Sequence, residues 1–199
     1  MTQLIGLTGQ SGAGKSLVSD IFRQNGFAVV DADLCSREAV EPGSKCLTEI
    51  AEIFGEKVIN SDKTLNRKVL AEIVFSDKSE LKKLNTVMHP FILDIVCKKI
   101  RELQNKGYKF IILDAPTLFE SKADDICDLI ISVTAKEDIR KKRISERDGI
   151  SEENIEKRFK SQNSEDFFIK NSNYIIKNNS SIDELREKTE KIAEKIQKG

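Results

Sequence analysis

The sequence predicts an α/β fold built on a parallel β-sheet that is buried on both faces. Five short apolar runs, at residues 3–7, 27–30, 110–113, 129–133 and 174–176, alternate with stretches whose apolar residues recur at helical spacing. Short apolar strands separated by helices are typical of a sheet that helices cover on both sides. We therefore expect a three-layer sandwich around a five-stranded parallel sheet.

Two stretches are too long to be simple crossovers between strands. Residues 35–108 have mostly helical patterns, which indicates a helical subdomain inserted into the core. Within it, Pro90 suits the first turn of a helix, so His89 would lie at a joint between two helices. Residues 136–170 form a charged helical excursion after the fourth strand. The residues left for the core are 1–34, 109–135 and 171–199.

Composition excludes several classes of protein. The 199 residues include 33 Lys and Arg and 33 Asp and Glu, so no net charge favours nucleic acid or an anionic membrane as a partner. Four cysteines occur without a Cys-x-x-Cys pair, and His89 is the only histidine, which disfavours a zinc site or a disulfide framework. Since neither a signal peptide nor a long apolar run is present, we expect a cytoplasmic protein.

A glycine-rich loop between the first strand and the next helix matches the pattern G-x-x-x-x-G-K-[ST]. It consists of Gly9, Gln10, Ser11, Gly12, Ala13, Gly14, Lys15 and Ser16. Such a loop wraps phosphates with backbone N–H groups, and the helix that follows adds its positive N-terminal dipole. Lys15 would reach the β- and γ-phosphates, and Ser16 would offer its hydroxyl to Mg²⁺. The motif predicts a P-loop NTPase fold; the alternative is a flexible glycine-rich turn.

Acidic residues follow two of the predicted strands. Asp114 ends the run at residues 110–113, as a Walker B carboxylate does, and could hold the metal directly or through water. Asp31 and Asp33 follow the second strand, and in an extended segment both would point toward the carboxyl edge of the sheet, where α/β folds bind ligands. One of them is positioned to meet the hydroxyl of an acceptor. The alternative is that these carboxylates only cap the elements that follow.

Three arginines in the excursion after the fourth strand would share one face of a helix. Arg140, Arg143 and Arg147 are spaced at i, i+3 and i+7. Guanidinium groups on a mobile segment stabilise charge on a transferring phosphoryl group and stack on adenine. The segment at 136–170 therefore predicts a lid over the nucleotide, with a solvated helix face as the alternative.

These elements together resemble the dephospho-CoA kinase family, in the family's order and along nearly the whole chain. Residues 84–90 read Leu-Asn-Thr-Val-Met-His-Pro, and residues 114–120 read Asp-Ala-Pro-Thr-Leu-Phe-Glu, each similar to a family motif. The other similar segments are residues 6–16, 31–33, 41–43, 65–67, 143–149 and 174–178. The resemblance implies a P-loop kinase with a helical substrate-binding subdomain and a lid.

The resemblance also implies a reaction and the residues that perform it. The chain would transfer the γ-phosphate of ATP, with Mg²⁺, to the 3′-hydroxyl of the ribose of dephospho-CoA, the last step of coenzyme A synthesis. The implied catalytic residues are Asp33 as the base, Lys15 and Arg143. The implied nucleotide-binding residues are those of the P-loop with Leu17, Arg143, Arg147 and Asn178. The implied acceptor-binding residues are Asp33, Arg67, His89, Pro116 and Leu118, and the metal ligands are Ser16 and Asp114.

We expect ATP and dephospho-CoA as partners, with no nucleic acid and no membrane, for a monomer or a weak homo-oligomer. Two other functions compete with this interpretation. A nucleoside monophosphate or small-metabolite kinase would share the P-loop, sheet and lid, but residues 31–33 and 89–90 point away from it. A nucleotide-dependent switch is the other, although the sequence has no Asn-Lys-x-Asp motif for reading guanine.

Overall fold

The computed structural model describes residues 2–199, apart from the side chains at positions 75 and 78. The chain divides into two compact units. The core unit consists of Met1–Val30 and Glu102–Gly199, and the helical unit consists of Asp31–Arg101. The insertion that we expect at residues 35–108 overlaps the helical unit.

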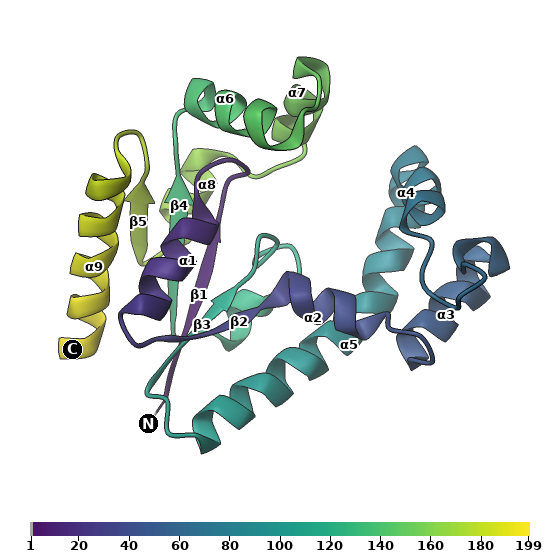
Figure 1. Ribbon diagram of the computed structural model, residues 1–199, viewed down its shortest axis with the longest axis horizontal. Helices are drawn as coiled ribbons and strands as arrows, with labels where there is room; N and C mark the ends of the chain where they lie inside the picture. Colours follow the sequence, from purple (N-terminus) through teal and green to yellow (C-terminus); the bar gives the residue numbers. More distant parts are fainter. Residues whose placement is uncertain (1) are drawn as a thin grey trace. The chain divides into compact units, whose positions relative to one another are not determined.

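A parallel sheet forms the centre of the core unit (Figure 1). Among the described residues, five strands form one sheet in the order β2-β3-β1-β4-β5. The strands are β1 (Gln3–Gly9), β2 (Ala28–Asp31), β3 (Phe110–Asp114), β4 (Leu129–Thr134) and β5 (Tyr174–Lys177). β1 pairs in parallel with β3 on one side and with β4 on the other, so the strand that leads into the P-loop is central. The predicted α/β fold with a five-stranded parallel sheet is confirmed.

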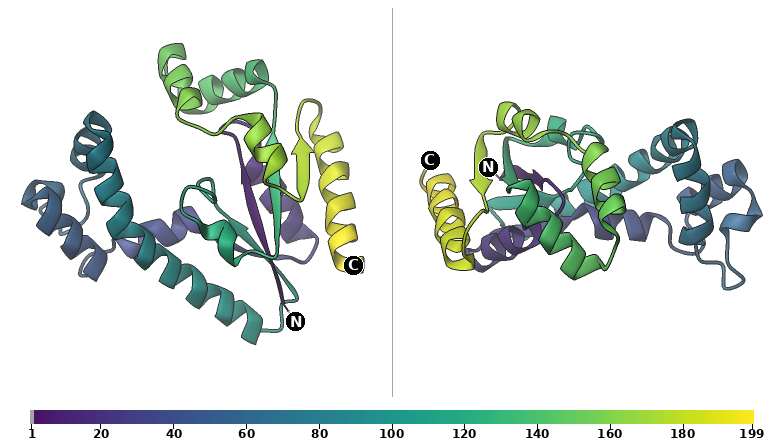
Figure 2. Two further views of the ribbon diagram at one scale, coloured as in Figure 1. Left: turned by 180° about the vertical axis from the view of Figure 1, so that it is seen from behind. Right: turned by 90° about the horizontal axis from the view of Figure 1, so that it is seen from above.

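Helices cover both faces of this sheet (Figures 1 and 2). α1 (Lys15–Gln24) and α9 (Ile182–Lys198) pack together on one face, and α8 (Glu165–Lys170) packs on β4 and β5 from the other. α6 (Glu137–Asp148) and α7 (Glu152–Lys160) contact each other and follow β4. Because α8 belongs to a sheet layer, the part of residues 136–170 that can act as a lid is α6 and α7.

Apolar side chains between the helices and the sheet hold the core unit together. In α1, Val18, Ile21 and Phe22 lie on one face and are fully buried. The ring of Phe22 packs edge-on against that of Phe27, with 5.0 Å between the centroids. The packing of α1 on the sheet therefore fixes the position of the loop that precedes α1.

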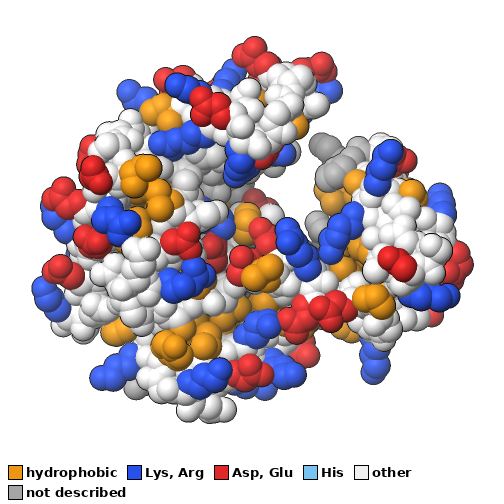
Figure 3. All heavy atoms as spheres, viewed as in Figure 1, with side chains coloured by type: hydrophobic (Ala, Val, Ile, Leu, Met, Phe, Trp, Pro, Cys, Tyr) orange, Lys and Arg blue, Asp and Glu red, His pale blue; other side chains and the backbone are white. Residues whose placement is uncertain are grey.

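The helical unit has an apolar cluster of its own, which includes Ile50 and Val58, both fully buried. Its elements are α2 (Ala32–Ala39), α3 (Lys45–Phe54), the 3₁₀ helix η1 (Glu56–Val58), α4 (Arg67–Ser76) and all but the last turn of α5 (Lys78–Asn105). None of the described helices combines the length and the hydropathy that a membrane crossing needs. On the face in Figure 3, basic and acidic side chains are interspersed, as expected from their equal numbers.

The expectation of a helix start at Pro90 is wrong. α5 continues through Pro90, so His89 lies inside a helix and not at a joint. Proline lacks the N–H that would bond the carbonyl of Thr86, which costs about 3 kcal/mol in a helix interior. Leu84 before the proline and Ile95 after it pack on the same apolar cluster. Burial on both sides of the proline favours one continuous helix over two.

Candidate active site

The P-loop has a backbone shape that favours glycine at three of its positions, Gly9, Gly12 and Gly14, which all have positive φ. Gly14, which precedes α1, has φ of 97°, a region that L side chains rarely adopt. A Cβ atom at Gly14 would lie 2.4 Å from Nδ2 of Asn178, and one at Gly9 would lie 2.3 Å from the backbone oxygen of Val133. The glycines therefore allow close contacts with neighbouring atoms as well as a tight turn.

The N-terminus of α1 is left open for a ligand. None of the described side chains caps this terminus, and its first turn contains no acidic residue. Other helices do have a side-chain cap: Ser44 caps α3, Asn66 caps α4 and Ser181 caps α9. Free N–H groups at the positive end of a helix dipole bind anions, above all phosphate. The chemistry of this terminus fits the phosphates of a nucleotide.

Two of the predicted nucleotide-binding residues hold carbonyl groups of the P-loop. The side-chain amide of Asn178 donates to the carbonyl of Ala13 over 2.8 Å. Arg143 donates to the side-chain oxygen of Asn178 over 3.3 Å and to the carbonyl of Gly12 over 3.5 Å. The described peptide bonds are all trans, so a carbonyl held on one side turns the next N–H to the opposite side. Asn178 thereby directs the N–H of Gly14 away from itself.

The predicted lysine and Walker B carboxylate meet beside the P-loop. β1 and β3 are in register with Leu7 opposite Asp114, which places Asp114 next to the strand that enters the loop. The Lys15 ammonium forms an ion pair with the Asp114 carboxylate, whose residue is only 7 % exposed. Lys15 is thus held at the site by an anionic partner.

Mg²⁺ fits the groups that the site offers. Ser16 is exposed in the first turn of α1, and Asp114 provides a carboxylate. Among the described residues no cluster of three or more His, Cys, Asp or Glu side chains could form an all-protein metal site. Mg²⁺ usually binds one or two protein oxygens together with substrate phosphates and waters. Ser16 and Asp114 remain the predicted ligands.

Arg147 is paired with the carboxylate of its neighbour in α6, Asp148. Its Nε donates to Oδ1 of Asp148 over 2.7 Å, and Nη1 of Arg158 donates to Oδ2 of the same carboxylate over 2.7 Å. Hydrogen bonds from Arg147 and then Arg158 hold the pKa of Asp148 well below its usual range. Arg147 would have to leave this pair to contact a nucleotide.

Arg140 has a role at the P-loop that the sequence did not reveal. It is only 6 % exposed, and its Nε donates to the carbonyl of Ala135 over 3.1 Å. Its guanidinium lies 4.1 Å from the ring centroid of Phe159. Burial lowers the pKa of Arg140, and the carboxylates of Glu137 and Glu165 oppose that shift. A basic residue in a charged helix usually faces solvent, so the helix itself gives no sign that Arg140 is buried. The apolar ring at position 159 is the one sequence feature that could have indicated it.

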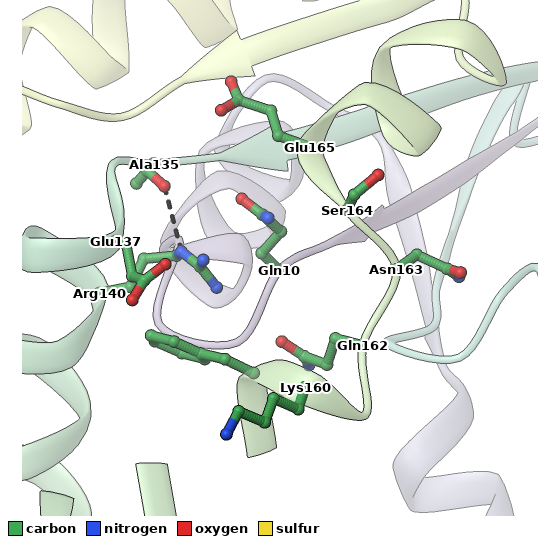
Figure 4. Close-up of a pocket in the computed structure, with 10 residues that line it drawn as sticks. Gln10, Ala135, Glu137, Arg140, Lys160, Gln162, Asn163, Ser164 and Glu165 are labelled. Carbon is green, nitrogen blue, oxygen red and sulfur yellow. Dashed lines mark hydrogen bonds between the residues drawn. The ribbon is translucent and has the colours of Figure 1, made fainter. Parts of the chain in front are cut away.

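A cavity of about 410 Å³ lies beside the P-loop, lined by residues that include Gln10, Arg140 and Phe159 (Figure 4). Gln162 also lines it, and its Oε1 accepts a hydrogen bond from the N–H of Ser11 over 3.1 Å. Oε1 of Gln10 is buried and lacks a partner among the described groups. The predicted P-loop residue Gln10 thus faces a polar cavity.

The extended arrangement that we expect at residues 31–33 is wrong. α2 begins at Ala32, and the carboxylate of Asp31 caps it by accepting hydrogen bonds from the N–H groups of Asp33 and Leu34, at 2.8 and 3.1 Å. Asp33 lies in the first helical turn and is exposed. The two carboxylates therefore differ: Asp31 stabilises the helix, and Asp33 is accessible to a ligand.

The other predicted acceptor-binding residues are divided between the units. Arg67 begins α4 and is exposed, and His89 is half-buried in α5, where burial lowers its pKa. Both belong to the helical unit with Asp33, whereas Pro116 and Leu118 belong to the core unit.

Leu118 is fully buried, and its Cδ2 atom lies 2.7 Å from where a Cβ of Gly6 would be. Close packing against β1 leaves no surface of the Leu118 side chain exposed, so a contact with the acceptor would have to come from its backbone, and its acceptor-binding role stays a prediction. Pro116 is half-buried, and its carbonyl accepts a hydrogen bond from Oγ1 of Thr8 over 3.2 Å. Leu17, predicted for the nucleotide, packs in part against the apolar core.

Comparison with known proteins assigns the family. The model of the dephospho-CoA kinase family matches residues 3–184. Dephospho-CoA kinase of Fusobacterium nucleatum is 40% identical over 193 residues, covering 97% of this chain and 98% of the relative. Dephospho-CoA kinase of Listeria monocytogenes serovar 1/2a is 38% identical over 191 residues, covering 96% and 94%.

Solved structures agree with this assignment. The crystal structure of a Thermus thermophilus protein superimposes with a TM-score of 0.86 at 28% identity, covering 100% of this chain and 99% of the other. Dephospho-CoA kinase from Campylobacter jejuni gives 0.75 at 28% identity with the same coverage. Shikimate kinase from Acinetobacter baumannii shares the fold, with a TM-score of 0.55 at 16% identity, covering 100% and 94%. The chain belongs to the dephospho-CoA kinase family.

Proposed function

We propose that this protein transfers the γ-phosphate of ATP to the 3′-hydroxyl of the ribose of dephospho-CoA, giving coenzyme A and ADP. One observation carries the proposal: a complete P-loop at an uncapped helix N-terminus, in a chain whose match to the dephospho-CoA kinase family spans residues 3–184. The P-loop supports ATP as the phosphate donor, and the family match supports dephospho-CoA as the acceptor.

The residues of the core unit would bind and orient the triphosphate. The loop N–H groups and the N-terminus of α1 would hold the phosphate oxygens, and Lys15 would exchange the Asp114 carboxylate for the β- and γ-phosphates. Arg143, already held against the carbonyls of Gly12 and Asn178, would stay beside the bound nucleotide. These groups act by positioning and by electrostatics, which carry most of the catalysis of phosphoryl transfer.

Ser16 and Asp114 would hold Mg²⁺, which neutralises charge on the β- and γ-phosphates when it is bound. The Asp114 carboxylate would then change its partner, because it binds the Lys15 ammonium here and is also the predicted metal ligand. Lys15 and Asp114 would exchange their mutual contact for contacts with the substrate complex.

Asp33 is proposed to orient the acceptor hydroxyl and to accept its proton. Three features support this role: Asp33 is exposed, it lies in the first helical turn after β2, and the nearby carboxylate of Asp31 already caps α2. Arg67 and His89, in the same unit, are proposed to bind the acceptor. The four cysteines are free, which supports a cytoplasmic site of action.

An acceptor assay tests the proposal. Purified protein is incubated with Mg-ATP and, separately, with dephospho-CoA, AMP, CMP or shikimate, and phosphorylated products are identified by chromatography and mass spectrometry. We expect efficient phosphorylation of dephospho-CoA alone, and a rate lower by roughly 10²-fold or more with Lys15→Ala prepared in the same way, which controls for contaminating kinases. Equal or better use of AMP would assign the protein to the nucleoside monophosphate kinases.

A further inference from the structure

Arg140 and Gln162 contact one residue of the P-loop, Ser11, and Phe159 packs against Arg140; we call these three side chains the Ser11 clamp. Nη1 of Arg140 is 3.5 Å from the carbonyl oxygen of Ser11, and Oε1 of Gln162 accepts from the Ser11 N–H. The Phe159 ring lies against the guanidinium of Arg140, so one face of the guanidinium is packed. At its edge, Nε of Arg140 donates to the carbonyl of Ala135 (Figure 4). Both peptide groups that flank Ser11 are therefore held by side chains from outside the loop.

The clamp determines which way an N–H group of the loop points. In a trans peptide the carbonyl of Ser11 and the N–H of Gly12 point in opposite directions. An Arg140 guanidinium that holds this carbonyl therefore turns the Gly12 N–H away from itself, toward the side on which a P-loop receives phosphate. Asn178 acts in the same way on the peptide between Ala13 and Gly14, through the carbonyl of Ala13.

The clamp also joins the loop to the lid. Arg140 belongs to α6, Phe159 lies near the end of α7, and Gln162 follows α7. α6 contacts the loop directly as well, since a Cβ atom at Gly12 would lie 2.9 Å from the carbonyl oxygen of Arg140. A displacement of α7 would remove the Gln162 amide oxygen from the Ser11 N–H, and it would remove the Phe159 ring that packs the guanidinium holding the Ser11 carbonyl.

We propose that Arg140 is a positioning residue for phosphate binding: through the Ser11 clamp it holds the Gly12 N–H in its binding orientation and makes that orientation depend on the position of α7. The ligand concerned is the polyphosphate part of the nucleotide. The inference rests on the proposed use of ATP, but its test requires no acceptor.

The first test measures binding of ATP and of inorganic tripolyphosphate by calorimetry. Arg140→Lys keeps the positive charge but cannot donate to the carbonyls of Ala135 and Ser11 together. We expect the Kd of ATP and that of tripolyphosphate to rise by the same factor, about tenfold, as for loss of a charge-assisted hydrogen bond. The matched control is Lys142→Ala, which removes an exposed charge from the same helix and should leave both values within about twofold.

The second test uses the ring. Phe159→Leu keeps an apolar side chain but removes the aromatic face, and we expect it to weaken ATP binding about as much as Arg140→Lys does, with little further loss in the double variant. Phe159→Tyr keeps the ring face and should remain within about threefold of the wild type. In steady-state assays the ATP KM should rise while kcat and the dephospho-CoA KM change by less than about threefold.

Two results would overturn the proposal. If Arg140→Lys lowers the melting temperature but leaves both Kd values unchanged, Arg140 has a structural role only. If ATP binding weakens while tripolyphosphate binding does not, Arg140 acts on the base and not on the phosphates. A wild-type protein that binds ATP but does not phosphorylate dephospho-CoA would instead contradict the proposed function, and the clamp would still be tested by the two Kd values.

Discussion

Replacing Gly14 with alanine should weaken ATP binding by about 30- to 150-fold. At φ of 97° an alanine is strained, which costs about 1–2 kcal/mol. Its Cβ would also lie 2.4 Å from Nδ2 of Asn178, so the amide must move and give up its 2.8 Å hydrogen bond to Ala13, worth about 1 kcal/mol. Without a ligand the P-loop can relax and relieve this strain, but the conformation that binds ATP requires the strained backbone again. A cost of about 2–3 kcal/mol then appears in the Kd as the factor given above.

Gly26→Ala provides a matched control for this measurement. Gly26 follows the other end of α1 with φ of 84°, and no described atom lies within 4 Å of a Cβ built there. This variant therefore has the backbone strain without the collision and away from the P-loop. It should lower the free energy of unfolding by about 1 kcal/mol in urea titrations and leave the Kd of ATP within about threefold of the wild type.

Calorimetric titration of the wild type and both variants with Mg-ATP decides the matter. The expected result is a large loss of affinity for Gly14→Ala alone. If Gly14→Ala binds ATP within threefold of the wild type, the close approach of Asn178 does not shape the loop. If Gly26→Ala loses as much affinity, the effect comes from the stability of α1 and not from the geometry of the phosphate site.

The other predictions concern residues of both units. Lys15→Ala should lower kcat by roughly 10²-fold or more, since a charge beside the transferred group is lost, and near wild-type turnover would refute the P-loop assignment. Asp33→Asn should lower kcat by roughly 10²- to 10³-fold. Asp31→Asn weakens a helix cap and should mainly lower the free energy of unfolding, by about 1 kcal/mol. A larger loss of kcat in Asp31→Asn than in Asp33→Asn, measured in one assay, would contradict the choice of base. Arg67→Ala should raise the KM of dephospho-CoA, and a parallel rise in the ATP KM would argue against an acceptor contact. Leu118→Ala should lower the free energy of unfolding by about 2–5 kcal/mol in urea, and a small loss accompanied by a higher acceptor KM would return this residue to the acceptor site.

The sequence predicts those parts of the fold whose signals are local. The P-loop is predictable because its glycines, lysine and serine sit between an apolar strand and a helix, and all of those elements are adjacent in the chain. Asp114 is predictable for the same reason, because it is a polar residue at the end of an apolar run. The order of the strands and the pairing of Leu7 with Asp114 depend on contacts between distant segments, which no local pattern contains.

The predictions from sequence are wrong where tertiary packing or helix capping outweighs a local preference of the chain. Pro90 is a helix breaker by itself, but apolar side chains on both sides of it are buried in the same cluster. Asp31 and Asp33 alternate in sequence as strand residues would, but Asp31 is an N-cap and ends the strand there. Arg140 occurs in a run of charges typical of solvated helices, and its burial follows from the position of Phe159, far along the chain.

Because α1 begins without a side-chain cap among the described residues, bound nucleotide becomes the cap of this helix. A side-chain cap is worth about 1 kcal/mol, and the protein without ligand lacks that contribution at the helix that anchors its central strand. A ligand that binds only the folded state raises the free energy of unfolding by about 2.7 kcal/mol at 100 times its Kd. Resistance to unfolding and to proteolysis would then follow the supply of ATP, so a cell depleted of its energy store would lose this protein faster than a well-supplied one.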